Sequence, residues 1–432
     1  MFSFSDYRFA LERQPLARPF TFKGGSFSEK WINVVRLFAD RAAGAPAGGN
    51  GGRSVSAIGG NAVLWSDAAV AHAWSQAGGN ALMTLLAERA VQLAQGVAFE
   101  HPVDAFCSIR HELHRWAQRI TGRPDVSPTF SLNSMVALDF ALWKLYALHR
   151  GTVCLQELLP AESREALSTT TQSLVRVPLI SYKVPAAEVS ELVRQGHRVL
   201  KIKLGQAGEP PQMVQRDSRR LEQIHHAVQQ QQRQHPLPVH YYLDANGRYP
   251  DLETLMSLLD HIDRSGILAR VIILEEPFPY QQKTPVHSVP LRVAADESLH
   301  DVADLQQRAD LGYRALALKP AGKTLSLSVL MATRAARLGI PCFVADSACV
   351  PSLLQWNLAF AALLPPFAEL GMGLIETNGA QHYANWTELL HEHADRCRDW
   401  LTPQSGIFTI DPEFTLHSGG VFSDSDHYSA LV

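Results

Sequence analysis

The sequence is poor in cysteine, with five among 432 residues, widely scattered and none spaced as Cys-x-x-Cys. This excludes a disulfide framework and favours a reducing, cytoplasmic compartment. The chain also lacks an apolar run of about 18 residues and a basic, apolar leader, so neither a membrane span nor a secretory signal is expected. An excess of one charge is lacking too, because 39 basic and 42 acidic residues give a net charge of −3. A dedicated nucleic-acid or membrane-surface binder is therefore not expected.

What the sequence does contain is enough apolar material for large cores, at 46% hydrophobic residues. At about 100–200 residues per domain, the length predicts two or three domains, or one large barrel with an appendage. Near the N-terminus, residues 2–12 and 19–24 alternate like strands, 28–42 form an amphipathic segment of helical type, and 44–52 form a glycine-rich loop. Strongly helical sequence follows and ends in a nearly all-apolar helix over 131–150, which a glycine terminates.

From about residue 175 the pattern changes to short β-rich runs that alternate with helix-like stretches. The eight runs are 177–182, 197–205, 239–247, 269–277, 291–298, 313–320, 340–347 and 372–377. Strands alternating with helices imply parallel βαβ units, and eight of them favour a (β/α)₈ barrel. A doubly wound open sheet is the alternative, but no glycine fingerprint follows the first run. The predicted fold class is α/β, a modified TIM barrel with an α+β capping domain.

Charged side chains lie at the ends of five neighbouring runs. They are, in order, Lys201 and Lys203, Asp244, Glu275, Asp296 and Lys319. Because the C-terminal ends of barrel strands face one mouth, where active sites assemble, these side chains should meet there. A single acid after a strand is often only a helix N-cap. Five consecutive charged strand ends indicate a functional site instead.

The chemistry of this set follows from its charges. Three carboxylates that converge in a partly buried pocket repel one another unless a cation binds them. Oxygen ligands without histidine or cysteine favour a hard ion, Mg²⁺ first and Mn²⁺ second. Lysines close to each other and to a metal should have a lowered pKa, so that one of them can act as a base. Such a site suits removal of a proton next to a carboxylate, with the metal stabilising an enediolate intermediate.

The succession KIK, DAN, EEP, ADES and LKP resembles the enolase superfamily, and within it the muconate lactonizing enzyme subgroup, which includes dipeptide epimerases and o-succinylbenzoate synthases. The resemblance implies that Asp244, Glu275 and Asp296 bind Mg²⁺. It implies Lys203 as the base on one face of the substrate, Lys201 as its electrostatic partner, and Lys319 as the acid, base or cation on the other face. It further implies that Asn246 and Glu297 contact the metal ligands and not the metal itself.

The resemblance also implies that the capping domain reaches over the barrel mouth. Substrate contacts are then expected from N-terminal loops and from the last two strand ends. The candidates are Phe22, Ser26, Phe27 and Trp65 in the first group, and Asp346, Ser347, Glu376 and Asn378 in the second. Core packing for the aromatic residues and strand-end capping for the polar ones are the alternatives.

These observations predict a capping domain over 1–170, a catalytic barrel over 175–385 and a C-terminal segment, 386–432, that packs back on the capping domain. The expected protein is an isomerase that removes the proton alpha to a carboxylate: a racemase or epimerase, or a cycloisomerase. A lyase that eliminates water, like o-succinylbenzoate synthase, is an alternative, and so is a catalytically silent barrel that binds a metal or metabolite. A small carboxylate is the expected partner, and a homo-oligomer is the expected assembly.

Overall fold

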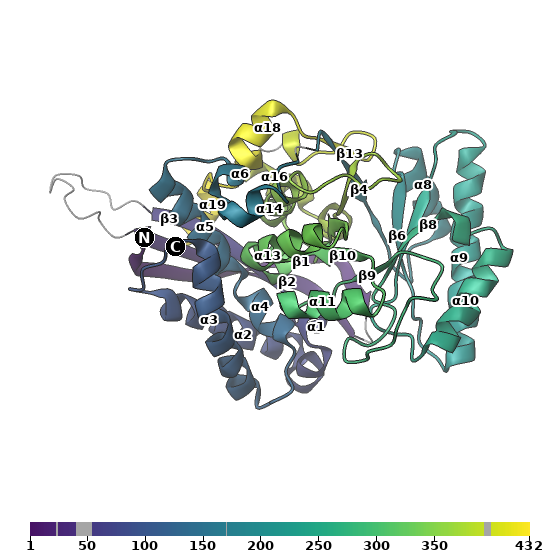
Figure 1. Ribbon diagram of the computed structural model, residues 1–432, viewed down its shortest axis with the longest axis horizontal. Coiled ribbons are helices and arrows are strands. Elements are labelled where there is room, and N and C mark those ends of the chain that lie inside the picture. Colours follow the sequence, from purple (N-terminus) through teal and green to yellow (C-terminus); the bar gives the residue numbers. More distant parts are fainter. Residues whose placement is uncertain (23–24, 40–53, 170, 393–398) are drawn as a thin grey trace.

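The computed structural model describes the chain except for residues 23–24, 40–53, 170 and 393–398 (Figure 1). The glycine-rich loop expected at 44–52 lies outside the described residues. The N-terminal part is an antiparallel sheet in the order β1-β2-β3, made of β1 (Phe4–Phe22), β2 (Gly25–Ala39) and β3 (Ser54–Asn61). The helices that follow are α1 (Val63–Ser66), α2 (Ala68–Ala94), α3 (Pro102–Thr121), α4 (Pro128–Ser134), α5 (Val136–Arg150), α6 (Leu155–Leu158) and α7 (Ala161–Arg164).

Two sequence expectations for this part are wrong. The described part of the segment over 28–42 is not helical, because 28–39 belong to β2, where the β-branched Ile32, Val34 and Val35 are fully buried between β1 and β3. The strand β3 was not expected, because no strand was predicted between the glycine-rich loop and the helical sequence that follows it. A Cβ on Gly59 would lie 2.6 Å from the backbone nitrogen of Ala137, so this glycine allows α5 to pack directly on the sheet.

The predicted apolar helix over 131–150 is present but divided at Met135 into α4 and α5. Helix α5 ends at Gly151, which has a φ of 70° and takes the left-handed conformation that closes a helix. Eleven of its residues are buried, since it lies between the N-terminal sheet and the barrel. Asp139 of α5 accepts hydrogen bonds from the backbone N–H groups of Leu325 and Ser326, so it caps a barrel helix.

Each of the eight predicted runs contains a barrel strand. The strands are β4 (Ser173–Val177) and β5 (Leu179–Ile180), β6 (Val199–Lys203), β7 (His240–Asp244), β8 (Val271–Glu275), β9 (Val293–Ala295), β10 (Ala315–Leu318), β11 (Cys342–Val344) and β12 (Gly373–Glu376). However, β4 begins before the first run and shares only Val177 with it. Strand β4 pairs with β12, and β5 pairs with β6, while only Pro178 separates β4 from β5. The two ends of the parallel ladder therefore meet in one segment, and the sheet closes on itself.

Helices cover the outside of this barrel, most visibly α8 (Ala186–Arg194), α9 (Pro210–Gln232) and α10 (Leu252–Arg264) along one edge of the molecule (Figure 1). The others are α11 (Val302–Asp310), α12 (Pro320–Lys323), α13 (Leu325–Arg337) and α14 (Pro351–Ala361), with the single turn η1 (Leu268–Arg270) before β8. Residues of β6 and β8 are buried throughout, as expected for parallel strands covered on both faces.

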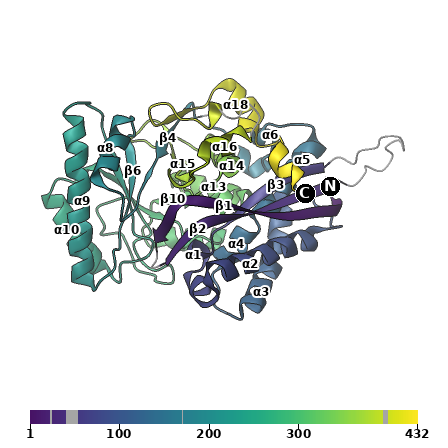
Figure 2. The ribbon, with the colours of Figure 1, turned by 180° about the vertical axis from the view of Figure 1, so that it is seen from behind.

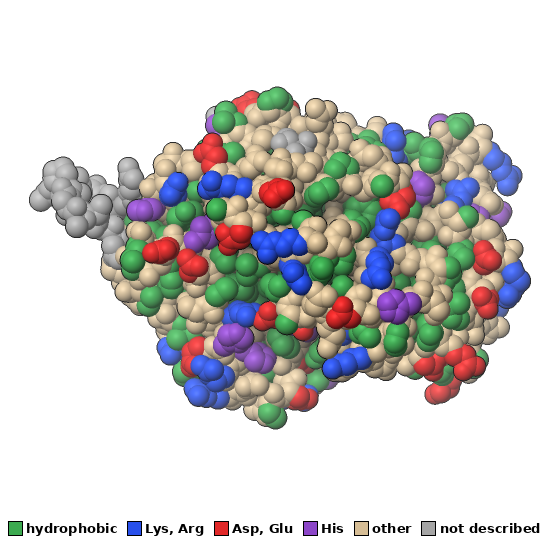
Figure 3. All heavy atoms as spheres, in the orientation of Figure 1, with side chains coloured by type: hydrophobic (Ala, Val, Ile, Leu, Met, Phe, Trp, Pro, Cys, Tyr) green, Lys and Arg blue, Asp and Glu red, His purple; other side chains and the backbone are tan. Residues whose placement is uncertain are grey.

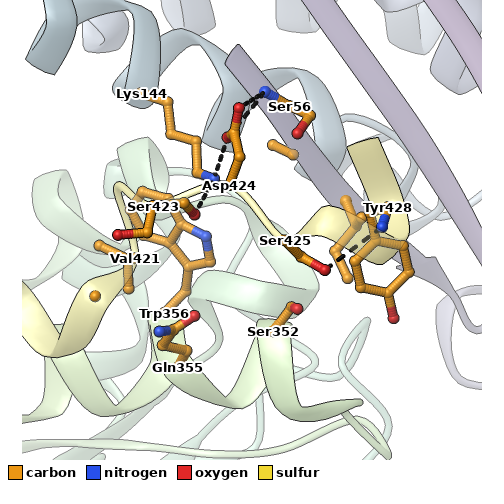
Figure 4. A pocket seen from close by; sticks show the side chains of 13 residues that line it. Ser56, Lys144, Ser352, Gln355, Trp356, Val421, Ser423, Asp424, Ser425 and Tyr428 are labelled. Atoms are coloured by element: carbon orange, nitrogen blue, oxygen red, sulfur yellow. Dashed lines mark hydrogen bonds and ion pairs between the residues drawn. The ribbon is translucent and has the colours of Figure 1, made fainter. Parts of the chain in front are cut away.

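The C-terminal part contains α15 (Gly379–His382), α16 (Trp386–His391), β13 (Ile407–Thr409), α18 (Pro412–His417), η2 (Ser418–Gly420) and α19 (Asp426–Ala430). Its last turn contacts the N-terminal sheet (Figure 4): Asp424 accepts a hydrogen bond from the backbone N–H of Ser56 and forms an ion pair with Lys144 at 2.9 Å. Strand β13, in contrast, stays with the barrel and pairs antiparallel with β4. On the side of the sheet that faces β4, β6 pairs with β5, so that edge of β4 is open, and β13 satisfies its backbone groups.

The hairpin of β1 and β2 extends from the N-terminal sheet toward the barrel (Figure 2). On the face drawn in Figure 3, acidic and basic side chains are interspersed rather than gathered by sign. No helix among the described residues is long and apolar enough to cross a bilayer.

Candidate active site

A cleft of about 470 Å³ lies between the hairpin of the N-terminal sheet and the C-terminal ends of the barrel strands. Most of the predicted site residues line it. They are Phe27, Trp65, Lys201, Lys203, Asp244, Asn246, Lys319, Asp346, Ser347, Glu376 and Asn378. Ser26 is exposed on β2 and is not among the residues that line this cleft, and its substrate contact stays a prediction. The side chain of Phe22 lies outside the described structure, and Phe20, which was not predicted, lines the cleft instead.

Lys201 lies at the centre of a buried charge cluster and is only 1% exposed. Its Nζ lies 2.8 Å from Asp244, 3.1 Å from Glu275 and 2.9 Å from Glu376. It also donates to the hydroxyl of Tyr242 at 3.0 Å. Burial disfavours the charged form of Lys201, but the three carboxylates outweigh burial and raise its pKa well above the ordinary value. Lys201 is therefore a fixed positive charge that links β6 with β7, β8 and β12.

Lys203 and Lys319 lie on opposite sides of the barrel mouth. Lys203 is the last residue of β6, and Lys319 follows β10 directly. Around the barrel, the path from β6 to β10 passes through β7, β8 and β9 in one direction. In the other direction it passes through the joined segment of β5 and β4 and then through β12 and β11. The Nζ of Lys203 contacts Asp244 at 2.6 Å, and that of Lys319 contacts Asp296 at 3.0 Å. Each lysine thus lines the cleft and contacts a different carboxylate.

The acid cluster partly differs from the predicted ligand set. Among the described residues, carboxylate oxygens of Glu275, Asp296 and Glu297 lie within 4.8 Å of one another, and all three residues are buried. Asp244 instead contacts Lys201 and Lys203, although its backbone is directly paired with Glu275. Three buried oxygen donors without histidine or cysteine fit a hard divalent cation.

The charges inside this cluster support that fit. Burial, together with the negative charges of Asp296 and Glu297, raises the pKa of Glu275 to about 8, against the opposing effect of Lys201 and Lys319. The pKa of Asp296 is held far below its usual range, because Lys319 and Lys323 outweigh its burial. Neighbouring acids whose pKa values are shifted in opposite directions are typical of a functional site, and here such a site could bind a cation.

The residues behind the ligands connect the cluster with the lysines. Asn246 accepts a hydrogen bond from Lys203 at 2.7 Å and donates one to Glu297 at 2.9 Å. Glu276 accepts hydrogen bonds from the backbone N–H of Asp296, at 2.7 Å, and from the hydroxyl of Ser298. Burial first, and then the charge of Glu297, raise the pKa of Glu276 to about 7.

The sequence led us to expect lysines whose pKa is lowered by each other and by a bound metal. The protein groups by themselves have the opposite effect on Lys319 and Lys201, whose pKa is raised because Asp296 and other acids outweigh the effect of burial. The sequence showed which charges converge, but not that each ammonium would have a carboxylate within about 3 Å.

Two further lysines were missed. Lys323 contacts Asp296 at 3.2 Å and also donates to the Asp296 carbonyl. Lys30 of β2 is 1% exposed and donates to the Ser347 carbonyl at 2.7 Å, which joins the N-terminal sheet to the loop after β11. Burial lowers its pKa to about 8. Lys323 follows the end of β10 by five positions and so does not stand at a predicted strand end, and nothing in the local sequence marks Lys30.

The comparisons with known proteins agree with this geometry. Residues 185–400, half of the chain, match the sequence profile of the enolase C-terminal domain-like family. A comparison with curated proteins found no match. Among solved structures, a mandelate racemase/muconate lactonizing protein from Herpetosiphon aurantiacus superposes with a TM-score of 0.64 at 16% identity, covering 96% of this chain and 97% of that one.

Two epimerases are similar in fold as well. The L-Ala-D/L-Glu epimerase from Bacillus subtilis gives a TM-score of 0.60 at 15% identity, with 88% of this chain and 91% of that one covered. A dipeptide epimerase from Enterococcus faecalis V583, complexed with Mg and the dipeptide L-Leu-L-Tyr, gives 0.59 at 16% identity, with 88% and 92% covered. The family match shows that the chain belongs to the enolase superfamily, and the capped barrel with its charged strand ends agrees with this assignment.

Proposed function

We propose that this enzyme removes the proton from the carbon next to a substrate carboxylate and returns a proton to either face, which makes it a racemase or epimerase. The observation that carries the proposal is the placement of Lys203 and Lys319 on opposite sides of one cleft. A substrate held between them presents one face of its α-carbon to each amine. Exchange of a proton on both faces then needs no further acid or base.

Mg²⁺ is the proposed cofactor, with Mn²⁺ as the alternative. Glu275 and Asp296 would hold it, because they belong both to the predicted ligand set and to the clustered acids. We propose Asp244 as the third ligand, because it lines the cleft beside Lys203, and Glu297 as its competitor. Bound there, a divalent cation supplies positive charge that stabilises the negative charge developing on the substrate carboxylate and compensates the acids that raise the pKa of Lys319.

The protein groups then have separate tasks. In one direction the neutral amine of Lys203 takes the α-proton while the ammonium of Lys319 gives a proton to the opposite face, and in the other direction the two exchange roles. Lys201 stays charged and adds positive potential beneath the substrate carboxylate. The aromatic side chains of Phe20, Phe27 and Trp65 cover the cleft and exclude water from the reacting carbon.

A one-base reaction is the second candidate, either cycloisomerisation or elimination of water. It is favoured by the contacts of Lys319, which donates to the Asp346 carbonyl at 3.1 Å and pairs with Asp296. An ammonium held in this way can act as a fixed cation while Lys203 alone moves the proton.

Solvent-deuterium exchange tests both candidates. The enzyme with Mg²⁺ is incubated in D₂O with a panel of carboxylates of both α-configurations, and proton NMR follows the α-hydrogen. Exchange from both configurations supports the racemase or epimerase, and exchange from one supports the one-base reaction. Absence of exchange across the panel, with Mg²⁺ bound, contradicts both and favours a silent binding protein.

A further inference from the structure

The carboxylates that line the cleft already have partners. Asp244 contacts both Lys201 and Lys203. Glu376 contacts Lys201 at 2.9 Å and also accepts hydrogen bonds from the backbone N–H of Asp346 and the side-chain amide of Asn378. An incoming positive group would have to displace a lysine to reach either acid.

The third lining carboxylate, Asp346, is held by the backbone. It accepts from the N–H groups of Ser347 at 2.7 Å, Cys349 at 3.1 Å and Asn378 at 2.7 Å. Its negative charge also acts on two buried cations, Lys30 and Arg176, whose charged forms it stabilises. Among the described residues of the cleft, every carboxylate therefore has its charge compensated.

Two buried neutral groups of the cleft, in contrast, have no hydrogen-bond partner in the described structure. They are the indole N–H of Trp65, in a side chain 9% exposed, and the amide oxygen of Asn378, in a side chain 3% exposed. One is a donor and the other an acceptor, and neither is charged. The rest of the wall is apolar and comes from Phe20, Phe27, Ala62, Leu179 and Ala348. Unpartnered buried polar groups are costly, so these two are available for a ligand.

We infer that the substrate is a carboxylate whose remaining part is uncharged and largely apolar, with at most a neutral hydrogen-bonding group that meets Trp65 and Asn378. The inference rests on the proposed function, because it takes the reacting carboxylate to lie at the lysines and acids. A free-amine dipeptide is a poor fit, because its ammonium would be desolvated here without an available counter-charge, which is costly. The chain thus differs in expected substrate from the dipeptide epimerases whose fold it shares.

Three ligands of nearly equal shape test the inference. N-propionyl-L-leucine, glycyl-L-leucine and N-malonyl-L-leucine differ at one terminal group, which is a methyl, an ammonium or a carboxylate. Each is measured with the Mg²⁺-loaded enzyme by calorimetric titration and by α-hydrogen exchange in D₂O, and the three phenylalanine counterparts repeat the series. We expect the propionyl compounds to bind and to exchange at least about 10-fold better than the charged ones, since an unpaired buried charge costs more than a factor of ten.

Equal or better binding of a glycyl or malonyl compound overturns the inference, and so does a failure of both propionyl compounds to bind. Preferential binding of the propionyl compounds without exchange of any probe supports the inference and contradicts the proposed function, so the two fail separately.

Asn378→Asp places a carboxylate at the open acceptor and should shift the preference toward glycyl-leucine by about 10-fold or more. The matched Asn378→Leu should keep the preference for the propionyl compounds, and a shift toward the ammonium in that variant also contradicts the inference.

Discussion

The two walls of the cleft differ in the type of side chain that lines them. The barrel wall is dense with paired charges, where Lys201 alone contacts three carboxylates. The wall from the N-terminal domain is mainly aromatic, from Phe20, Phe27 and Trp65. A charge network can stabilise a charged reaction path only where rigid strands hold it, whereas apolar contacts tolerate change in shape. We therefore expect the barrel to provide the chemistry and the N-terminal domain to contact the apolar part of the substrate.

The largest expected effect is on the barrel wall. Arginine in place of Lys203 or Lys319 keeps the positive charge but cannot accept a proton at neutral pH. Each variant should therefore lose about 10²- to 10⁴-fold in exchange, with Lys203→Arg and Lys319→Arg affecting opposite α-configurations of an epimerase substrate. For a one-base reaction, only Lys203→Arg should abolish exchange. Proton NMR in D₂O measures this, with the exposed Lys183→Arg as control. Full activity in both variants would show that the lysines do not carry the reaction.

The second largest expected effect is on the affinity for Mg²⁺. Asp244→Asn should weaken Mg²⁺ binding by about 100-fold and Glu297→Gln by about 10-fold, because removal of a ligand costs more than removal of a group behind it. Calorimetric titration of both variants measures the ratio. The reverse order would assign the site to Glu275, Asp296 and Glu297, the acids that cluster in the structure.

The aromatic wall should show a smaller effect of another kind. Phe27→Ala removes apolar contact with the substrate tail but touches no group that moves a proton, so KM should rise about 10-fold while kcat changes less than about threefold. Steady-state kinetics separates the two constants. A fall in kcat equal to that of the lysine variants would contradict the division of roles between the walls.

The smallest effect concerns Lys30, which joins the walls through the Ser347 carbonyl. Its pKa is lowered by burial to about 8 in the folded chain, from about 10.5 when unfolded. Between these values the unfolded chain binds the proton and the folded chain does not, so this lysine makes the free energy of unfolding rise with pH. Denaturant unfolding from pH 8 to 10.5 should show that rise in the wild type relative to Lys30→Met. Parallel pH curves for the two proteins would disprove a lowered pKa.

The barrel was predictable from the sequence because each strand is a short apolar run that ends in a charge. Asp244, Glu275 and Asp296 occur where the apolar run of a strand stops and the mouth begins, so each of these acids marks both the end of a strand and a position in the site. No local signal of this kind exists for β2 and β3. The two strands pair with each other, and close packing rather than local strand propensity explains Gly59 and Gly60 in β3.

The partners of the predicted residues were less predictable than the residues themselves. The contact of Glu376 with Lys201 joins positions 175 residues apart, and that of Lys30 with Ser347 joins positions 317 apart. Such contacts follow from the closure of the barrel and the placement of the N-terminal sheet, which a single sequence does not encode at short range. For the same reason the raised pKa values of Lys201 and Lys319 became evident only in the folded structure.

The contact between the last helical turn and strand β3 has a consequence for the order in which the protein folds during synthesis. Ser56 bonds to Asp424 and Ser429, more than 360 residues later in the chain. During synthesis, Ser56 therefore lacks these two partners until the barrel has been made, because both follow the barrel in the chain. The barrel strands, made in sequence, can pair in the meantime. We expect the N-terminal domain to complete its contacts only after the barrel strands have formed.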